Sequence, residues 1–326
     1  MSATDVRRNI APTLIIRSMV TVIGVPRSGT NMHQVSPGRV GGIYEVKQGG
    51  YGWNCRGRFG NTATYLLRQR ARNLLIGEDM KDGYRVLVLP DIHIEEGMDQ
   101  TIAAAALQFG QWWKPDETII LGDLINFDYI SHYTEKDGIA REGKRLKADF
   151  GMARMILKTI SGFTSGKKIF TLGNHDMRLD IWVRQHPQIE GLLSLDYNLN
   201  LKQEGWDVIN EGKVYKIGHA KFVHGWYWSK YHAHKTVVET GDNIFYGHVH
   251  DVQAYSKSNI DRQPIMGQSL GCLCNLNPEY KKNRPNCWVN AFGVFYFFSN
   301  GQFNHYIPII VNSRFNFAGK IFDGNK

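Results

Sequence analysis

The stretch Arg85-Val-Leu-Val-Leu-Pro-Asp-Ile-His93 sets the pattern for most of the chain, because a short apolar run leads directly into two polar residues. A short run of branched apolar residues is typical of a buried strand. Apolar positions at helical spacing follow at residues 101–113, and strands that alternate with helices make a layered fold. We therefore expect the α/β class, with a strand at residues 85–89 and a helix at 101–113.

The same alternation continues along the chain. Further apolar runs that predict strands lie at residues 118–121, 168–172, 220–223 and 243–246. Helical spacing of apolar positions predicts another helix within residues 143–160. Two later strands, at residues 288–298 and 302–311, flank Ser299-Asn-Gly301, a turn sequence that predicts a hairpin.

Five of the predicted strands end in residues that commonly bind metal ions. These strand ends are Asp91-Ile-His93, Gly122-Asp123, Gly173-Asn-His-Asp176, His224 and Gly247-His-Val-His250. In layered α/β sheets, ligands bind outside the carboxyl ends of the strands, so the five loops can converge on one site. On an extended backbone, side chains two residues apart point the same way, so Asp-x-His and His-x-His can each deliver two ligands.

The residue types also restrict the chemistry. Histidine with Asp or Asn, without a thiolate, suits borderline divalent ions such as Mn²⁺, Fe²⁺ or Zn²⁺. The ligands are numerous enough for two ions, which together can activate a water molecule and bind both the attacking and the leaving oxygens of a phosphate. The sequence therefore predicts a two-metal site that acts on phosphoesters.

This order of motifs resembles the calcineurin-like metallophosphoesterase superfamily over roughly residues 85–311. The resemblance implies a two-sheet sandwich flanked by helices, with two divalent ions, Mn²⁺ in the first place and Fe²⁺, Zn²⁺ or Ni²⁺ as alternatives. It implies that one ion is held by Asp91, His93, Asp123 and His250. The second ion would be held by Asp123, Asn174, His224 and His248, which makes Asp123 the bridge.

The same resemblance implies a catalytic role for His175, which would contact the phosphate and help to protonate the leaving oxygen, oriented by Asp176. Asn174 and Arg178 are the expected substrate-binding residues, with a solvated side chain as the alternative for Arg178. Leu172 stands where the protein Ser/Thr phosphatase branch has an arginine, so a phosphoprotein is a poor substrate.

The closer similarity is to the bacterial and bacteriophage branch of phosphodiesterases and DNA-repair exonucleases, through Leu-Gly-Asp-Leu-Ile-Asn-Phe-Asp128 and Tyr-Gly-His-Val-His250. We expect a hydrolase of phosphodiester bonds, specifically a nuclease that acts on DNA through a metal-bridging hydroxide. Two alternatives stay open. One is a phosphodiesterase or phosphatase for nucleotides or cyclic nucleotides, and the other is a DNA-binding structural protein with a vestigial site.

Residues 1–84 form a basic, glycine-rich segment ahead of the expected catalytic domain at 85–326. They hold twelve Lys and Arg against five Asp and Glu, a net charge of +7 out of the whole chain's +9. Such asymmetry indicates a polyanionic partner, for which nucleic acid, DNA above all, is the expectation, with a solvated basic surface as the alternative. The segment's aromatic residues Tyr51, Trp53 and Phe59 could stack on bases, or 49–60 could instead be a β-hairpin or a subunit contact.

Other features of the sequence set broader limits. Residues 20–31 faintly resemble a helix-turn-helix, and a homo-oligomer stays open. No apolar run reaches the roughly 20 residues of a membrane span, and the N-terminus does not read as a secretory signal. The cytoplasm, of the host if the protein is viral, is therefore expected. The four cysteines are too sparse for a disulfide framework, lack metal-ligand spacing and are expected to be buried.

Overall fold

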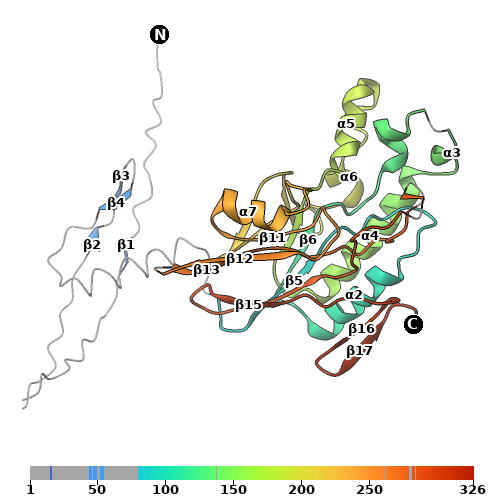
Figure 1. Ribbon diagram of the computed structural model, residues 1–326. Coiled ribbons are helices and arrows are strands. Elements are labelled where there is room, and N and C mark those ends of the chain that lie inside the picture. The colour runs from blue at the N-terminus through green and yellow to red at the C-terminus, as the bar shows by residue number, and fades with distance from the viewer. Residues whose placement is uncertain are drawn as a thin grey trace, which may run out of the picture. The chain divides into compact units, whose positions relative to one another are not determined.

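The computed structural model describes residues 80–326, apart from 137, 261, 279, 280 and 283, together with four short strands earlier in the chain (Figure 1). The chain divides into two compact units, residues 1–71 and 72–326.

In the first unit, the described residues form two small antiparallel pairs. Strand β1 (Ile15–Ile16) pairs with β2 (Tyr44–Glu45), and β3 (Lys47–Gly49) pairs with β4 (Gly52–Asn54). The second pair overlaps residues 49–60, for which a β-hairpin was an alternative to base stacking. The expected helix-turn-helix at residues 20–31 lies outside the described residues, as do Tyr51 and Phe59.

In the second unit, a six-stranded mixed sheet has the order β15-β14-β5-β6-β7-β8. Its parallel strands are β5 (Tyr84–Leu89), β6 (Glu117–Leu121), β7 (Lys168–Thr171) and β8 (Trp206–Ile209). Strand β14 (Gly293–Phe297) runs antiparallel to β5 and forms a hairpin with β15 (Phe303–Tyr306).

A five-stranded mixed sheet has the order β12-β13-β11-β10-β9. Its strands are β9 (Tyr215–Ile217), β10 (Ala220–Val223), β11 (Asn243–Tyr246), β12 (Ala254–Asn259) and β13 (Arg262–Ser269). Strands β10, β11 and β13 run parallel, whereas β9 and β12 are antiparallel to their neighbours. Strands β10 and β11 therefore present their carboxyl ends at the same edge.

Helices lie on the outer sides of the two sheets (Figure 1). Among the residues that the structure describes, the helices are α2 (Thr101–Trp113), α3 (Gly138–Arg141), α4 (Leu146–Phe163), α5 (Met177–Gln185), α6 (Leu195–Leu199) and α7 (His232–Thr240). Three single-turn 3₁₀ helices, η1 (Asp128–Ile130), η2 (His132–Thr134) and η3 (Pro187–Ile189), add to them. The last hairpin, β16 (Arg314–Phe317) with β17 (Lys320–Asp323), packs against α2.

The core follows from the two-residue period of the strands, which sends alternate side chains to opposite faces. Val86 and Val88 of β5 belong to a buried cluster with Phe222 of β10 and Phe245 of β11, which joins the two sheets. The intervening side chain Leu87 belongs to the larger cluster beneath α2 and α4. Strand β5 is therefore buried on both faces, which explains why its sequence is a continuous apolar run.

The predicted α/β class is confirmed, and the two packed sheets with outer helices are compatible with the expected sandwich. All five strands expected before the polar loops are present, and α2 has the predicted bounds. Helix α4 begins at residue 146 rather than 143, because Gly143 has a φ of 75° and Arg145 is extended. Among the residues that the structure describes, no helix has the length and apolar character of a membrane span.

Candidate metal centre

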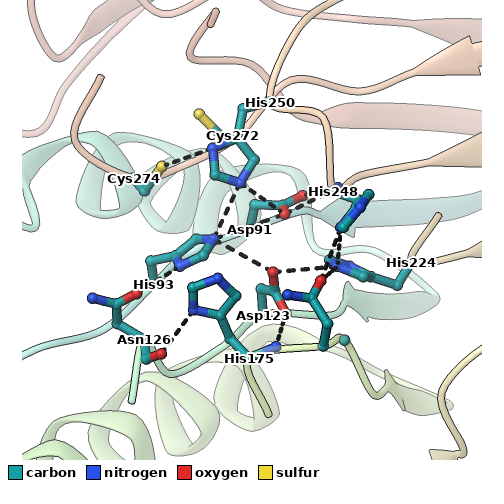
Figure 2. A network of polar contacts seen from close by, with 12 residues as sticks. Asp91, His93, Asp123, Asn126, His175, His224, His248, His250, Cys272 and Cys274 are labelled. Carbon is teal, nitrogen blue, oxygen red and sulfur yellow. Dashed lines mark hydrogen bonds and ion pairs between the residues drawn. The ribbon is translucent and has the colours of Figure 1, made fainter. Parts of the chain in front are cut away.

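The five polar loops converge at one place, where the carboxyl ends of β5, β6 and β7 meet those of β10 and β11 (Figure 2). One group of donor atoms, all within 4.8 Å of one another, comes from Asp91, His93, Asp123 and His250. A second group that meets the same distance comes from Asp123, His224 and His248. The amide oxygen of Asn174 adjoins the second group, 2.8 Å from His248 Nδ1. The structure thus brings all seven predicted ligands together, in two groups that share Asp123.

The backbone at this site differs from the expected extended form. Five ligand residues have positive φ angles, namely Asp91 (48°), His93 (50°), Asp123 (49°), His248 (69°) and His250 (63°). The left-handed region costs non-glycine residues of order 1–2 kcal/mol each, and such residues cluster at functional sites. The extended-backbone reason given for Asp-x-His and His-x-His was therefore wrong, although both pairs do deliver two side chains to the site.

Hydrogen bonds stabilise these loops in their strained form. The backbone N–H of His248 donates to both carboxylate oxygens of Asp91, each at 3.0 Å, and so joins the loop after β11 to the loop after β5. The backbone N–H of His175 donates to Asp123 Oδ1 at 2.8 Å. The two carboxylates are therefore oriented by the backbone of neighbouring loops before any ion binds.

Glycines of the motifs let these loops approach closely. A Cβ atom on Gly173 would lie 2.2 Å from Asp123 Oδ1, and one on Gly247 would lie 2.1 Å from Asp91 Oδ2. At Gly122, with a φ of 87°, a Cβ would lie 2.3 Å from His224 Nδ1. Any larger residue at these positions would displace a candidate ligand.

In the first group, the imidazoles of His93 and His250 face each other with their Nε2 atoms 3.1 Å apart (Figure 2). The amide nitrogen of Asn126 donates to carboxylates of Glu95 and Asp128, so its Oδ1 faces His93 Nδ1 at 3.1 Å and accepts from it. A neutral His93 therefore carries its proton on Nδ1 and presents a bare Nε2 to His250. The arrangement calls for a proton or a metal cation between the two rings.

The second group also has a histidine nitrogen that carries no proton when the ring is neutral. His224 Nδ1 lies 2.9 Å from the carbonyl oxygen of Leu121, which can only accept, so the ring donates there. Its Nε2 then faces Asp123 Oδ2 at 3.2 Å and Asn174 Oδ1 at 3.1 Å. In the neutral ring this nitrogen would be bare between two oxygens, so the arrangement calls for a proton or a divalent cation there.

The electrostatics of the buried groups agree with this geometry. Burial alone would lower the pKa of His93, but hydrogen bonding to Asp91 and the charge of Asp123 raise that pKa to about 9. Burial likewise opposes charging of His224, yet the Asp123 carboxylate raises the pKa of this residue to about 10. Although burial favours their neutral forms, neighbouring histidines lower the pKa values of Asp91 and Asp123. The site therefore attracts positive charge, and its Asp, His and Asn donors fit a divalent metal ion.

His175 lies beside the donor groups and belongs to neither. Its ring centroid is 4.4 Å from that of His93, and its Nδ1 is 2.7 Å from the carbonyl oxygen of Asn126 (Figure 2). A guanidinium nitrogen of Arg178 lies 3.1 Å from its Nε2. Burial lowers the pKa of His175 to about 3, which favours a neutral ring that donates from Nδ1.

The expected orientation of His175 by Asp176 is corrected by these contacts, because both ring nitrogens have other partners. Asp176 is fully buried and accepts backbone N–H groups of Gly173 at 2.9 Å and Leu124 at 3.1 Å. Burial raises the pKa of this carboxyl to about 7. Asp176 therefore fixes the loops after β6 and β7 and acts on the site through them.

Arg178, predicted to bind phosphate or to be solvated, is held by protein groups. It forms an ion pair with Asp128 and donates to the carbonyl oxygen of Asn126 at 2.9 Å. Its charge is thus partly neutralised where it approaches His175. A role in binding phosphate stays a prediction.

Asn126 and Cys274 also lie at the site, although no motif in the sequence identified them as site residues. Asn126 contacts both His93 and His175, and it lies within the Leu-Ile-Asn-Phe-Asp128 motif, which had served only to indicate the branch of the family. Cys274 Sγ lies 3.7 Å from His250 Nδ1 and forms with His93 and His250 a further group of donors that could hold a metal ion, contrary to the expectation that the cysteines lie away from metal ligands. Cys274 and Cys272 are buried as expected, whereas Cys287 is exposed, contrary to the prediction.

Comparison with known proteins provides no relative, since neither a protein-family model nor a curated protein matches the chain. Inferences about function therefore depend on the geometry of this centre.

Proposed function

We propose that the chain is a two-metal phosphodiesterase of the calcineurin-like type, and that its substrate is nucleic acid, with DNA as the first choice. The observation that carries this proposal is the pair of buried donor groups that share Asp123. Two ions bridged by one carboxylate are the typical arrangement for hydrolysis of phosphoesters. Asp91, His93 and His250 would complete one ion's coordination, and Asn174, His224 and His248 would complete that of the other.

The protein's own groups have separate tasks in such a reaction. When bound, the two ions would supply Lewis-acid chemistry, activating water and offsetting the charge of the phosphate. His175 would hold or donate a proton at Nε2 once a bound phosphate drew the Arg178 guanidinium away from that nitrogen. A bound phosphate would favour the charged form of this ring, which burial disfavours. Asn126 accepts from its Nδ1 and would fix the direction of Nε2.

The choice of nucleic acid is supported by charge. The basic segment ahead of the metal centre carries +7 of the chain's net charge of +9, and phosphate neutralisation dominates affinity for nucleic acids. A small phosphodiester would need no such segment.

A substrate panel tests the proposal. The Mn²⁺-loaded protein is assayed on bis(p-nitrophenyl) phosphate, a cyclic nucleotide, and single- and double-stranded DNA, with Asp123→Asn as the matched inactive variant. We expect hydrolysis of the chromogenic diester and of DNA, both abolished in the variant. Hydrolysis of the cyclic nucleotide without DNA would favour the small-molecule alternative. DNA binding without hydrolysis under any of Mn²⁺, Fe²⁺, Zn²⁺ or Ni²⁺ would favour a vestigial site.

A further inference from the structure

A tryptophan lies beside each of the two donor groups. In the first group, the ring of Trp288 is 4.2 Å from that of His250, centroid to centroid. In the second group, the ring of Trp228 is 6.1 Å from that of His248. The two come from unrelated parts of the chain, one from the loop before β14 and one from the loop between β10 and α7.

Trp288 forms part of a cavity of about 460 Å³ next to the first group. The walls also include Cys274, which contacts His250, and the apolar side chains of Leu276, Ile309 and Val311. The ammonium group of Lys281 lies 3.8 Å from the centre of the Trp288 ring. Cavities of this size hold small organic molecules, and an aromatic ring forms part of the wall of this one. A nucleoside attached to the phosphate would fit that chemistry.

Trp228 belongs to the loop Gly225-Trp-Tyr-Trp-Ser-Lys-Tyr231, which directly follows the ligand His224. Two of its aromatic residues are anchored, since Trp226 donates to the carbonyl oxygen of Gly212 at 3.3 Å and Tyr227 lies under Lys235.

The other two aromatic residues project into solvent, with 79% of Trp228 and 66% of Tyr231 exposed. Lys230 lies 5.4 Å from the centre of the Tyr231 ring. Exposed aromatic rings next to lysines are the means by which proteins bind unpaired bases and the phosphates between them.

We propose that this centre acts on single-stranded nucleic acid, with the nucleosides on the two sides of the scissile phosphate held by Trp288 and by Trp228 with Tyr231. This inference deepens the proposed function and rests on it. A phosphodiester, unlike a monoester, has an organic group on each side, which matches an aromatic residue beside each donor group. Bases within a duplex are already stacked and paired, so only unpaired bases can stack on both rings.

Binding measurements on the full chain test the proposal. A labelled 12-nucleotide single strand and its duplex, both with a hydrolysis-resistant phosphorothioate backbone, are titrated by fluorescence anisotropy against the Mn²⁺-loaded protein. We expect tighter binding of the single strand. Trp228→Ala and Trp288→Ala should each weaken it by about 5- to 150-fold, the range for loss of one stacked base. Trp228→Phe and Trp288→Phe should restore most of the affinity, because phenylalanine retains a stacking ring.

Trp112→Ala is the control, since Trp112 is also partly exposed but lies on α2 against Phe322. Thermal unfolding of each variant verifies that the fold is retained. The proposal is overturned if both alanine variants bind the single strand like the control, or if the wild type prefers the duplex. These binding results are separate from a test of the proposed function. The proposed function fails if the Mn²⁺-loaded wild type hydrolyses no phosphodiester.

Discussion

At the scale of single residues, one oxygen atom of Asp123 links the two donor groups. Its Oδ2 lies 3.6 Å from His93 Nε2 and 3.2 Å from His224 Nε2. We expect two ions per wild-type chain and loss of both in Asp123→Asn, because the neutral amide is a weaker ligand. His250→Gln should lose one ion only, since His250 is absent from the group of Asp123, His224 and His248 that would hold the second ion. Elemental analysis after desalting measures this, and a wild type that binds fewer than two ions would contradict it.

His175 lies outside both donor groups, so its removal should separate metal binding from catalysis. We expect His175→Ala to keep two ions while kcat falls by about 10²–10⁴, the usual effect of losing a positioned proton donor. His186→Ala is the control, because His186 is exposed and contacts only neighbouring residues of its helix. Turnover is measured on a diester with a poor leaving group. Loss of metal, or near-normal turnover, would show that the assigned role is wrong.

At the scale of elements, the site depends on loops that glycine allows to approach. Gly247→Ala should weaken binding of the metal ion in the first donor group, because the alanine Cβ would lie 2.1 Å from Asp91 Oδ2 and would displace that carboxylate. Gly151→Ala is the matched control, since this glycine of α4 has no atom within 4 Å of its Cβ position. We expect the control to retain metal and to gain about 0.5–1 kcal/mol of stability. Equal metal affinity in both variants, measured by titration, would contradict the prediction.

The sequence patterns of individual strands explain how much of the fold could be predicted from the sequence. The strands that carry ligands are buried on both faces or end in polar motifs, so apolar runs such as residues 85–89 and 118–121 locate them. Strands β12 and β13 were missed because their sequences are largely polar, and Pro264 interrupts the pattern.

Cys274 and Trp288 were missed for a different reason. They lie in a largely irregular stretch held by long-range bonds, such as Leu273 N–H to Asp91 O at 3.0 Å and Val289 N–H to His250 O at 2.8 Å. No local period encodes such contacts, because they arise only once distant strands have paired.

At the scale of the whole molecule, the two compact units differ in net charge. Residues 1–71 hold ten Lys and Arg against two Asp and Glu, a net charge of +8, which leaves +1 for residues 72–326. The expected boundary after residue 84 would remove groups that belong to the second unit. Met80 packs against its core, and Lys81 pairs with Asp116 at 2.9 Å. A truncation that tests the basic segment should therefore end at residue 71.

Deletion of residues 1–71 should leave metal content and hydrolysis of bis(p-nitrophenyl) phosphate intact, because the strands and loops of the centre all lie within the second unit. Affinity for DNA should fall, and the slope of log affinity against log salt should flatten by about 0.7–0.9 for each phosphate that the segment neutralises. Salt titrations of the full and shortened chains measure both quantities. If affinity and slope are unchanged, the segment serves assembly or packing, and the case for nucleic acid depends on the aromatic residues beside the metal centre alone.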